Sequence, residues 1–206
     1  MTISPPAPAK GLRRRDWAVI EFAALDFEAT GLDLANDHVI SFGVVPIRDA
    51  RIVLGEGVHQ LVRPPIPPSP SSVTVHRMRT QDLTEAPLLE EAVEVLAGAL
   101  ANRFILAWHA SVELALLDRV FGRAGRGFSR RCIDVRKLAI IDANAHPKSP
   151  SPGSLSGCAA RYHVPVAAPH EAFDDALVTA QLFLVLATRL RVRGIRTVGD
   201  LLRAGR

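Results

Sequence analysis

The chain has 206 residues, of which 48% are hydrophobic, and a formal net charge of +4 with a pI near 9.7. This length favours a single domain with one core. No apolar run approaches the roughly 18 residues of a membrane span, and the N-terminus lacks the apolar segment of a signal peptide. We therefore expect a soluble cytoplasmic protein. The two cysteines form no CxxC pair, so the sequence indicates neither a disulfide framework nor a structural zinc site.

Residues 1–15 combine prolines with a basic cluster and have no apolar periodicity, which predicts a disordered basic arm. Three segments then have the pattern of strands: 19–28, 38–47 and 52–62. Residues 63–72 contain five prolines and predict a loop. The rest of the chain alternates between the two patterns: helix 87–100, strand 104–108, helix 111–121 capped by Ser111, strand 132–135, and helices 154–162 and 171–190.

This order of elements predicts an α/β or α+β fold with a mixed sheet. We assign residues 16–190 to one domain and residues 191–206 to a basic C-terminal helix or tail, in which Thr197-x-x-Asp200 has the spacing of a capping box. The basic residues are 22 Arg and only three Lys. Arginine grips phosphate oxygens with a two-pronged donor fork, so an acidic polymer is a permitted partner, although coding bias also explains the count.

The first predicted strand ends in residues 25–32, LDFEATGL. Because side chains alternate along a strand, Asp26 and Glu28 lie on one face. Neighbouring carboxylates repel each other unless a cation lies between them, and their oxygens suit Mg²⁺ or Mn²⁺. A solvated acidic pair at a strand end is also common, so this motif alone does not distinguish a metal site from such a pair. Gly31 permits a tight turn and a close backbone approach to a ligand.

This segment resembles the first motif of the DnaQ-like, or DEDD, 3'-5' exonucleases, and the later motifs follow in the same order between residues 17 and 190. Residues 170–176, HEAFDDA, match every fixed position of the third motif, H-x-A-x-x-D-A, of the histidine subclass (DEDDh). His170 precedes the predicted helix and Asp175 lies in its early turns, so both can face the end of the first strand. The alternatives are a surface cap for His170 and a first-turn acid favoured by the helix dipole for Asp175.

The second motif departs from the family pattern, because the usual H-N-A-x-F-D becomes WHASVE at residues 108–113. Glu113 keeps the acid but adds a methylene, and its alternative is a helix-start acid two residues after Ser111. His109 replaces the usual amide. Trp108 replaces the usual histidine, and either stacks on a base or belongs to the core.

The resemblance implies a ribonuclease H-like fold with a mixed five-stranded sheet. It also implies two-metal hydrolysis that releases 5'-mononucleotides from the 3' ends of single-stranded DNA or RNA. The implied ligands of the two Mg²⁺ or Mn²⁺ ions are Asp26, Glu28, Asp175 and Glu113. His170 would accept the proton of the attacking water. The implied contacts to the terminal nucleotide are Thr30, Gly31, Leu32 and His109.

Two other hypotheses remain open at the level of sequence. The altered second motif also fits a catalytically impaired exonuclease-fold module that binds nucleic acid or has a regulatory role. A metal-dependent hydrolase of small nucleotides is the second alternative. DNA and RNA are not distinguished by these residues, nor are roles in proofreading, repair and RNA processing. The sequence indicates neither a particular polymerase or repair partner nor an oligomeric state.

Overall fold

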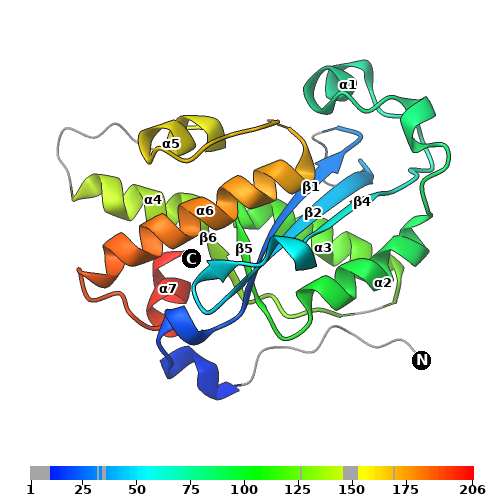
Figure 1. Cartoon of the computed structure of the whole chain (residues 1–206). Coiled ribbons are helices and arrows are strands. Elements are labelled where there is room, and N and C mark those ends of the chain that lie inside the picture. Colours follow the sequence, from blue (N-terminus) through cyan, green and yellow to red (C-terminus); the bar gives the residue numbers. More distant parts are fainter. Residues whose placement is uncertain (1–9, 32, 34–35, 126, 146–152, 169) are drawn as a thin grey trace.

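The computed structural model describes residues 10–206 except 32, 34–35, 126, 146–152 and 169. Its centre is a mixed sheet (Figure 1), whose strands are β1 (Phe22–Ala29), β2 (Val39–Arg48), β3 (Arg51–Ile52), β4 (Val58–Leu61), β5 (Phe104–Ala107) and β6 (Cys132–Asp134). The order is β3-β2-β1-β5-β6, and β4 also pairs with β2. Strand β1 runs antiparallel to β2 and parallel to β5. The expected fold class is therefore confirmed.

The described residues form six strands where five were expected, because the predicted strand 52–62 is interrupted. A short 3-10 helix, η3 (Leu54–Glu56), separates β3 from β4. Both short strands pair with β2, so together they occupy the edge position that one longer strand was expected to fill. The order of the other strands does not depend on this break.

Helices cover both faces of the sheet (Figure 1). Their bounds are α1 (Pro70–His76), α2 (Leu89–Leu100), α3 (Ala110–Arg123), α4 (Val135–Asn144), α5 (Leu155–Arg161), α6 (Ala172–Arg191) and α7 (Val198–Ala204). The two faces of β1 belong to different cores. Phe22 and Ala24 pack with residues of α4, α6 and α7, whereas Ala23, Leu25 and Phe27 pack with residues of α2 and α3. The alternation of β1 therefore directs Asp26 and Glu28 to the α6 side.

Two helices differ from the sequence prediction because their N-terminal caps were not recognised. The proline-rich segment was expected to remain a loop to Ser72, but α1 starts at Pro70. Proline is tolerated at the first position of a helix, and the Ser69 side chain caps it by accepting from the Ser72 amide. Helix α4 was not expected. The Asp134 side chain caps it by accepting from the Lys137 amide.

The N-terminal segment is more ordered than expected from Lys10 onward. Residues 1–9 of the expected arm lie outside the described residues, but Lys10–Arg14 form a 3-10 helix, η1. The chain then pairs with the C-terminal region, since the Val198 amide donates to the Arg15 carbonyl and the Trp17 amide donates to the Arg196 carbonyl. The described part of the arm therefore packs against α7.

No helix of the described residues has the length and apolarity to cross a membrane.

The expected C-terminal helix forms as α7 and packs against the core. Thr197 and Asp200 make the capping box, and Leu201 is fully buried. At its far end the Gly205 carbonyl accepts from the Asp134 amide at 3.1 Å. Helix α7 thus lies between η1 and β6, at the opposite end of β1 from Asp26 and Glu28 (Figure 1).

Candidate active site

The acidic pair at the end of β1 lies under the first turn of α6. Asp26 is directly opposite Gly43 on β2. A Cβ atom on Gly43 would lie 2.3 Å from the Ala172 carbonyl oxygen, so only glycine lets α6 begin this close to the sheet. This close approach brings the third-motif residues to the β1 carboxylates. No feature of the local sequence around Gly43 indicated this role.

Three of the expected site residues meet within ligand distance of one another. One ligand atom each from Glu28, His170 and Asp175 lies within 4.8 Å of the other two. His170 has a left-handed backbone with φ of 64°, which is unfavourable for a residue with a side chain. Its amide donates to the Asp175 carboxylate at 3.2 Å, and this bond holds the turn before α6 in place.

Glu113 reaches the same site from α3. It is only 5% exposed, and its Oε2 has no hydrogen-bond partner among the described residues. The Asp134 carboxylate accepts from the Ala110 amide at 3.2 Å and so holds the start of α3 against β6. The helix begins at Ala110 with His109 as its N-cap, so Ser111 is not the cap that the sequence suggested. A buried carboxylate oxygen without a hydrogen-bond donor is unfavourable unless it is protonated or a cation binds to it.

The carboxylates raise one another's pKa. Burial raises the pKa of Glu28 to about 8, with a further contribution from Asp175. Burial also raises the pKa of Glu113 to about 8, and Glu28 adds to it. The pKa of Asp26 is raised well above its usual range by burial and then by its acidic neighbours, Glu113 foremost. Such a cluster binds either protons or cations, and oxygen-only ligands match hard divalent ions.

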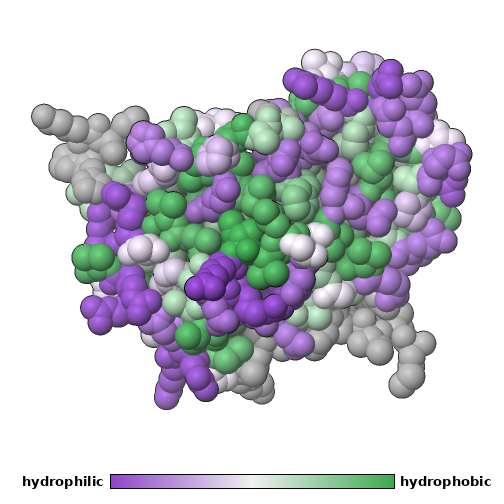
Figure 2. All heavy atoms as spheres, in the orientation of Figure 1, coloured by the Kyte–Doolittle hydropathy of each residue, from purple (hydrophilic) through white to green (hydrophobic). Residues whose placement is uncertain are grey.

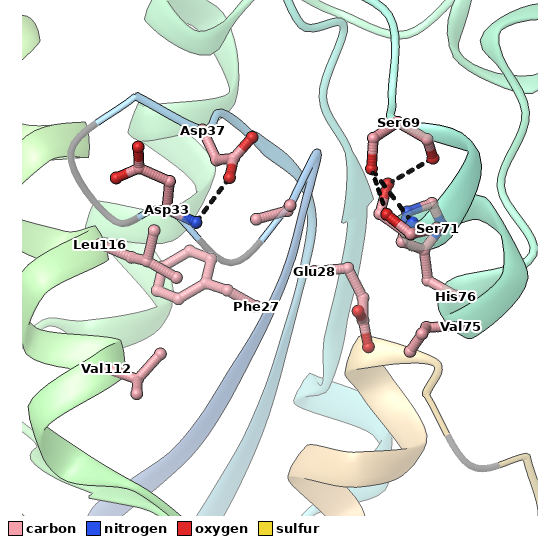
Figure 3. A pocket seen from close by; sticks show the side chains of 13 residues that line it. Phe27, Glu28, Asp33, Asp37, Ser69, Ser71, Val75, His76, Val112 and Leu116 are labelled. Carbon is pink, nitrogen blue, oxygen red and sulfur yellow. Dashed lines mark hydrogen bonds between the residues drawn. The ribbon is translucent and has the colours of Figure 1, made fainter.

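A cavity of about 600 Å³ opens beside Glu28 (Figure 3). Its apolar side comes from Phe27 on β1 and from Val112 and Leu116 on α3, while α1 and the residues before it close the other side. His76 of α1 lines it and is 6% exposed. The His76 Nδ1 accepts from the Met78 amide at 3.0 Å, and its Nε2 has no partner among the described residues. Because Nδ1 accepts this bond, the ring hydrogen lies on Nε2, which can donate to a ligand. Burial lowers the pKa of His76.

The residues expected to contact substrate differ in their positions. Gly31 lines the cavity, and a Cβ there would lie 2.5 Å from an Asp37 carboxylate oxygen. Thr30 is 2% exposed and does not line it, because its hydroxyl donates to Asp37 at 2.7 Å. Leu32 lies outside the described residues. His109 is exposed and lies outside the cavity lining.

Trp108 belongs to the core. It is 5% exposed and packs within the α6-side cluster. Of the two interpretations of this tryptophan, the structure therefore places it as a core residue and not as a platform for a base. Sequence reasoning also gave no catalytic role to His76 or Asp134, and the structure gives each a position at the site: His76 in the cavity wall, and Asp134 beneath α3.

The fold is that of the ribonuclease H-like exonucleases. The structure superposes on E. coli exonuclease I in complex with a dT13 oligonucleotide with a TM-score of 0.74, at 14% identity, covering 85% of this chain and 42% of that one. It also superposes on the nuclease domain of 3'hExo, a DEDDh family member bound to rAMP, with a TM-score of 0.68, at 16% identity, covering 87% and 96%.

The chain belongs to the RNase_T exonuclease family, whose profile matches residues 23–183. Among curated relatives it is 29% identical over 183 residues to the PolC-type DNA polymerase III of Thermotoga petrophila, covering 87% of this chain and 13% of that protein. It is 25% identical over 167 residues to the 3'-5' exonuclease DinG of Staphylococcus epidermidis, covering 81% and 18%. The chain thus spans less than a fifth of the length of these two relatives.

Proposed function

We propose that this protein is a metal-dependent 3'-5' exonuclease that releases 5'-mononucleotides from the 3' end of single-stranded nucleic acid. The observation that carries the proposal is the meeting of Glu28, His170 and Asp175 within 4.8 Å, beside two further acids, Asp26 and Glu113, whose pKa values respond to the same cluster. The names of the similar proteins, a DEDDh nuclease and a 3'-5' exonuclease, support the direction of cleavage.

The donor set fits divalent cations. Glu113 has a buried oxygen that no described residue satisfies, and the neighbouring carboxylates repel one another when all are ionised. We propose that Asp26, Glu28, Asp175 and Glu113 hold two Mg²⁺ or Mn²⁺ ions. When bound, such ions neutralise phosphate charge and lower the pKa of a coordinated water.

His170 then acts as the general base. In this proposal a ring nitrogen of His170 accepts a proton from the attacking water, and the water oxygen bonds to phosphorus. The bond from phosphorus to the 3' oxygen breaks, and this oxygen leaves with the bonding electron pair and takes a proton from solvent. The exposed position of His170 at the start of α6 allows the protonated ring to release its proton to solvent. The terminal nucleoside would occupy the cavity lined by Phe27, Val112 and His76.

The direct test is digestion of 5'-labelled single-stranded DNA and RNA with Mg²⁺, Mn²⁺ or chelator. We expect a ladder of products that shorten from the 3' end, release of 5'-mononucleotides, no cleavage in chelator, and protection by a 3'-phosphate. Asp26→Asn and Asp175→Asn should each lower turnover by at least about 1,000-fold.

The matched control is Asp174→Asn, because Asp174 precedes Asp175 in the first turn of α6 and is not part of the ligand cluster. It should retain most of the activity. Wild-type protein that shortens neither polymer with any metal would refute the proposal. Retained oligonucleotide binding without turnover would identify the impaired binding module instead.

A further inference from the structure

Charge is unevenly distributed along the chain. Residues 10–16 and 189–206 together contain ten basic and two acidic residues, although the whole chain has a net charge of only +4. The remaining sequence is therefore net acidic, and it includes the carboxylate cluster. The folded structure brings these two basic segments together, through the backbone bonds from Val198 to Arg15 and from Trp17 to Arg196.

The junction of the two segments forms a basic hollow of about 340 Å³ between η1 and α7, away from the candidate active site. Arg13 and Arg14 line it from η1, and Arg203 and Arg206 line it from the C-terminal end. Its floor includes Gly199, where a Cβ would lie 2.9 Å from the Arg13 carbonyl oxygen. A close backbone contact thus sets the geometry of the hollow. In Figure 2 hydrophilic residues lie beside hydrophobic ones at the lower edge, where Figure 1 places η1.

Three of the four arginines of this hollow have no acidic partner among the described residues, and the fourth, Arg203, pairs with Asp200. Within the described residues, Arg13, Arg14 and Arg206 form no ion pair, and none of the residues lining the hollow is acidic. The nearby acids are already engaged: Asp16 pairs with Arg191, and Asp200 with Arg203. Four guanidinium groups around one concavity provide donors for several phosphate oxygens.

We propose that this hollow, the η1–α7 basic site, binds the sugar-phosphate backbone of a nucleic acid strand whose 3' end lies in the active site. The inference rests on the proposed function for the identity of the strand. The site lies near the start of β1 and the carboxylates lie at its end (Figure 1). Strand β1 is itself buried beneath helices on both faces, so the nucleic acid strand would cross the surface of these helices over at least the length of β1. Eight residues of strand extend about 23 Å. At about 3.4 Å per stacked nucleotide, roughly seven nucleotides separate the two sites.

This separation predicts a dependence on substrate length. A trinucleotide reaches only the carboxylate end, whereas a 24-nucleotide strand occupies both sites. Each phosphate contact contributes about −0.7 to the slope of log affinity against log salt for a single strand. Loss of two contacts should therefore reduce the slope by about 1.4 and weaken binding of the long strand about 25-fold at 0.1 M salt.

The test compares Arg14→Glu, Arg206→Glu and the double variant with Arg51→Glu in the full chain. Arg51 is an exposed arginine on β3 outside the hollow, so its substitution makes the same charge change elsewhere. Binding of fluorescein-labelled (dT)24 is measured by anisotropy in chelator at several salt concentrations, and turnover of (dT)3 is measured with Mn²⁺. We expect weakened (dT)24 binding in each single variant, with a salt slope reduced by about 0.7, and a reduction of about 1.4 in the double variant. Arg51→Glu should bind (dT)24 more tightly than these variants, and (dT)3 turnover should be unchanged in all variants.

Equal (dT)24 affinity in the double variant and Arg51→Glu would overturn the proposal. So would a poly-glutamate peptide that displaces (dT)24 at lower concentration than unlabelled (dT)24 does, since the site would then suit an acidic protein. Thermal melts check folding, and the two single substitutions lie on opposite chain ends, so a folding defect in one leaves the other informative. If wild-type protein shortens neither (dT)24 nor RNA with any metal, the proposed function fails, while the binding measurements in chelator still decide on the hollow.

Discussion

Glu113→Gln offers a test of the site that does not depend on catalysis. In the metal-free protein, the pKa of Glu113 is raised from 4.5 to about 8 by burial and by Glu28. The folded state therefore binds more protons than the unfolded state between these values. The resulting stability is fully present below pH 4.5 and is lost as pH rises to 8. Glutamine has nearly the same shape and carries no charge at any pH.

The size of the effect follows from the shift. A pKa raised by 3.5 units lowers the free energy of unfolding, relative to its value below pH 4.5, by at most about 5 kcal/mol above pH 8. At pH 6 the same loss is about 2 kcal/mol. Between pH 6 and 9, the wild-type protein in chelator should therefore lose up to about 3 kcal/mol more stability than Glu113→Gln. For a chain of 206 residues, this is a difference of roughly 6–12 °C in Tm.

The assay is thermal unfolding followed by circular dichroism at pH 6 and pH 9, in chelator and with Mn²⁺. Mn²⁺ should raise the Tm of the wild-type protein more at pH 9 than at pH 6, and should raise that of Glu113→Gln less. Glu85→Gln makes the same chemical change at an exposed turn and should behave as the wild type. A wild-type Tm in chelator with the same pH dependence as Glu113→Gln would refute the placement of Glu113 in a buried carboxylate cluster.

Three further predictions concern single side chains. His170→Gln should lower kcat by about 100-fold or more because proton transfer is lost, while Mn²⁺ should still raise Tm because the carboxylates remain. A kcat of His170→Gln equal to that of the wild type from pH 6 to 9 would remove His170 from the mechanism. Gly43→Ala should push Ala172 away from the sheet and reduce both Tm and turnover, since the added Cβ overlaps backbone; wild-type values of both would contradict the close approach of α6. His76→Ala should raise KM about five- to tenfold with little change in kcat, because loss of the donor weakens binding by about 1–1.4 kcal/mol. An unchanged KM in steady-state digestion would place the terminal nucleotide elsewhere.

Much of the candidate site was predictable from sequence because its residues lie in short motifs. Asp26 and Glu28 share one face of a strand by alternation, and His170 and Asp175 are five residues apart around a helix start, so local geometry nearly determines each pair. The strand and helix pattern likewise predicted the fold class. The errors were a loop that became a helix, a helix that was not expected and a strand that is interrupted by η3. Caps explain the two helices, because Ser69 allows α1 to start among prolines and Asp134 caps the start of α4.

The sequence by itself therefore determined which functional groups the protein has: two pairs of motif residues, a glutamate at position 113 where the family motif has an aspartate, and an excess of arginine. Only the tertiary structure decided which of these groups meet. Contacts between distant segments bury Glu113 and place Gly43 beneath α6. They also bring Arg14 and Arg206 to the same hollow. Such contacts follow from the packing of helices on a particular strand order, and local periodicity does not encode that order.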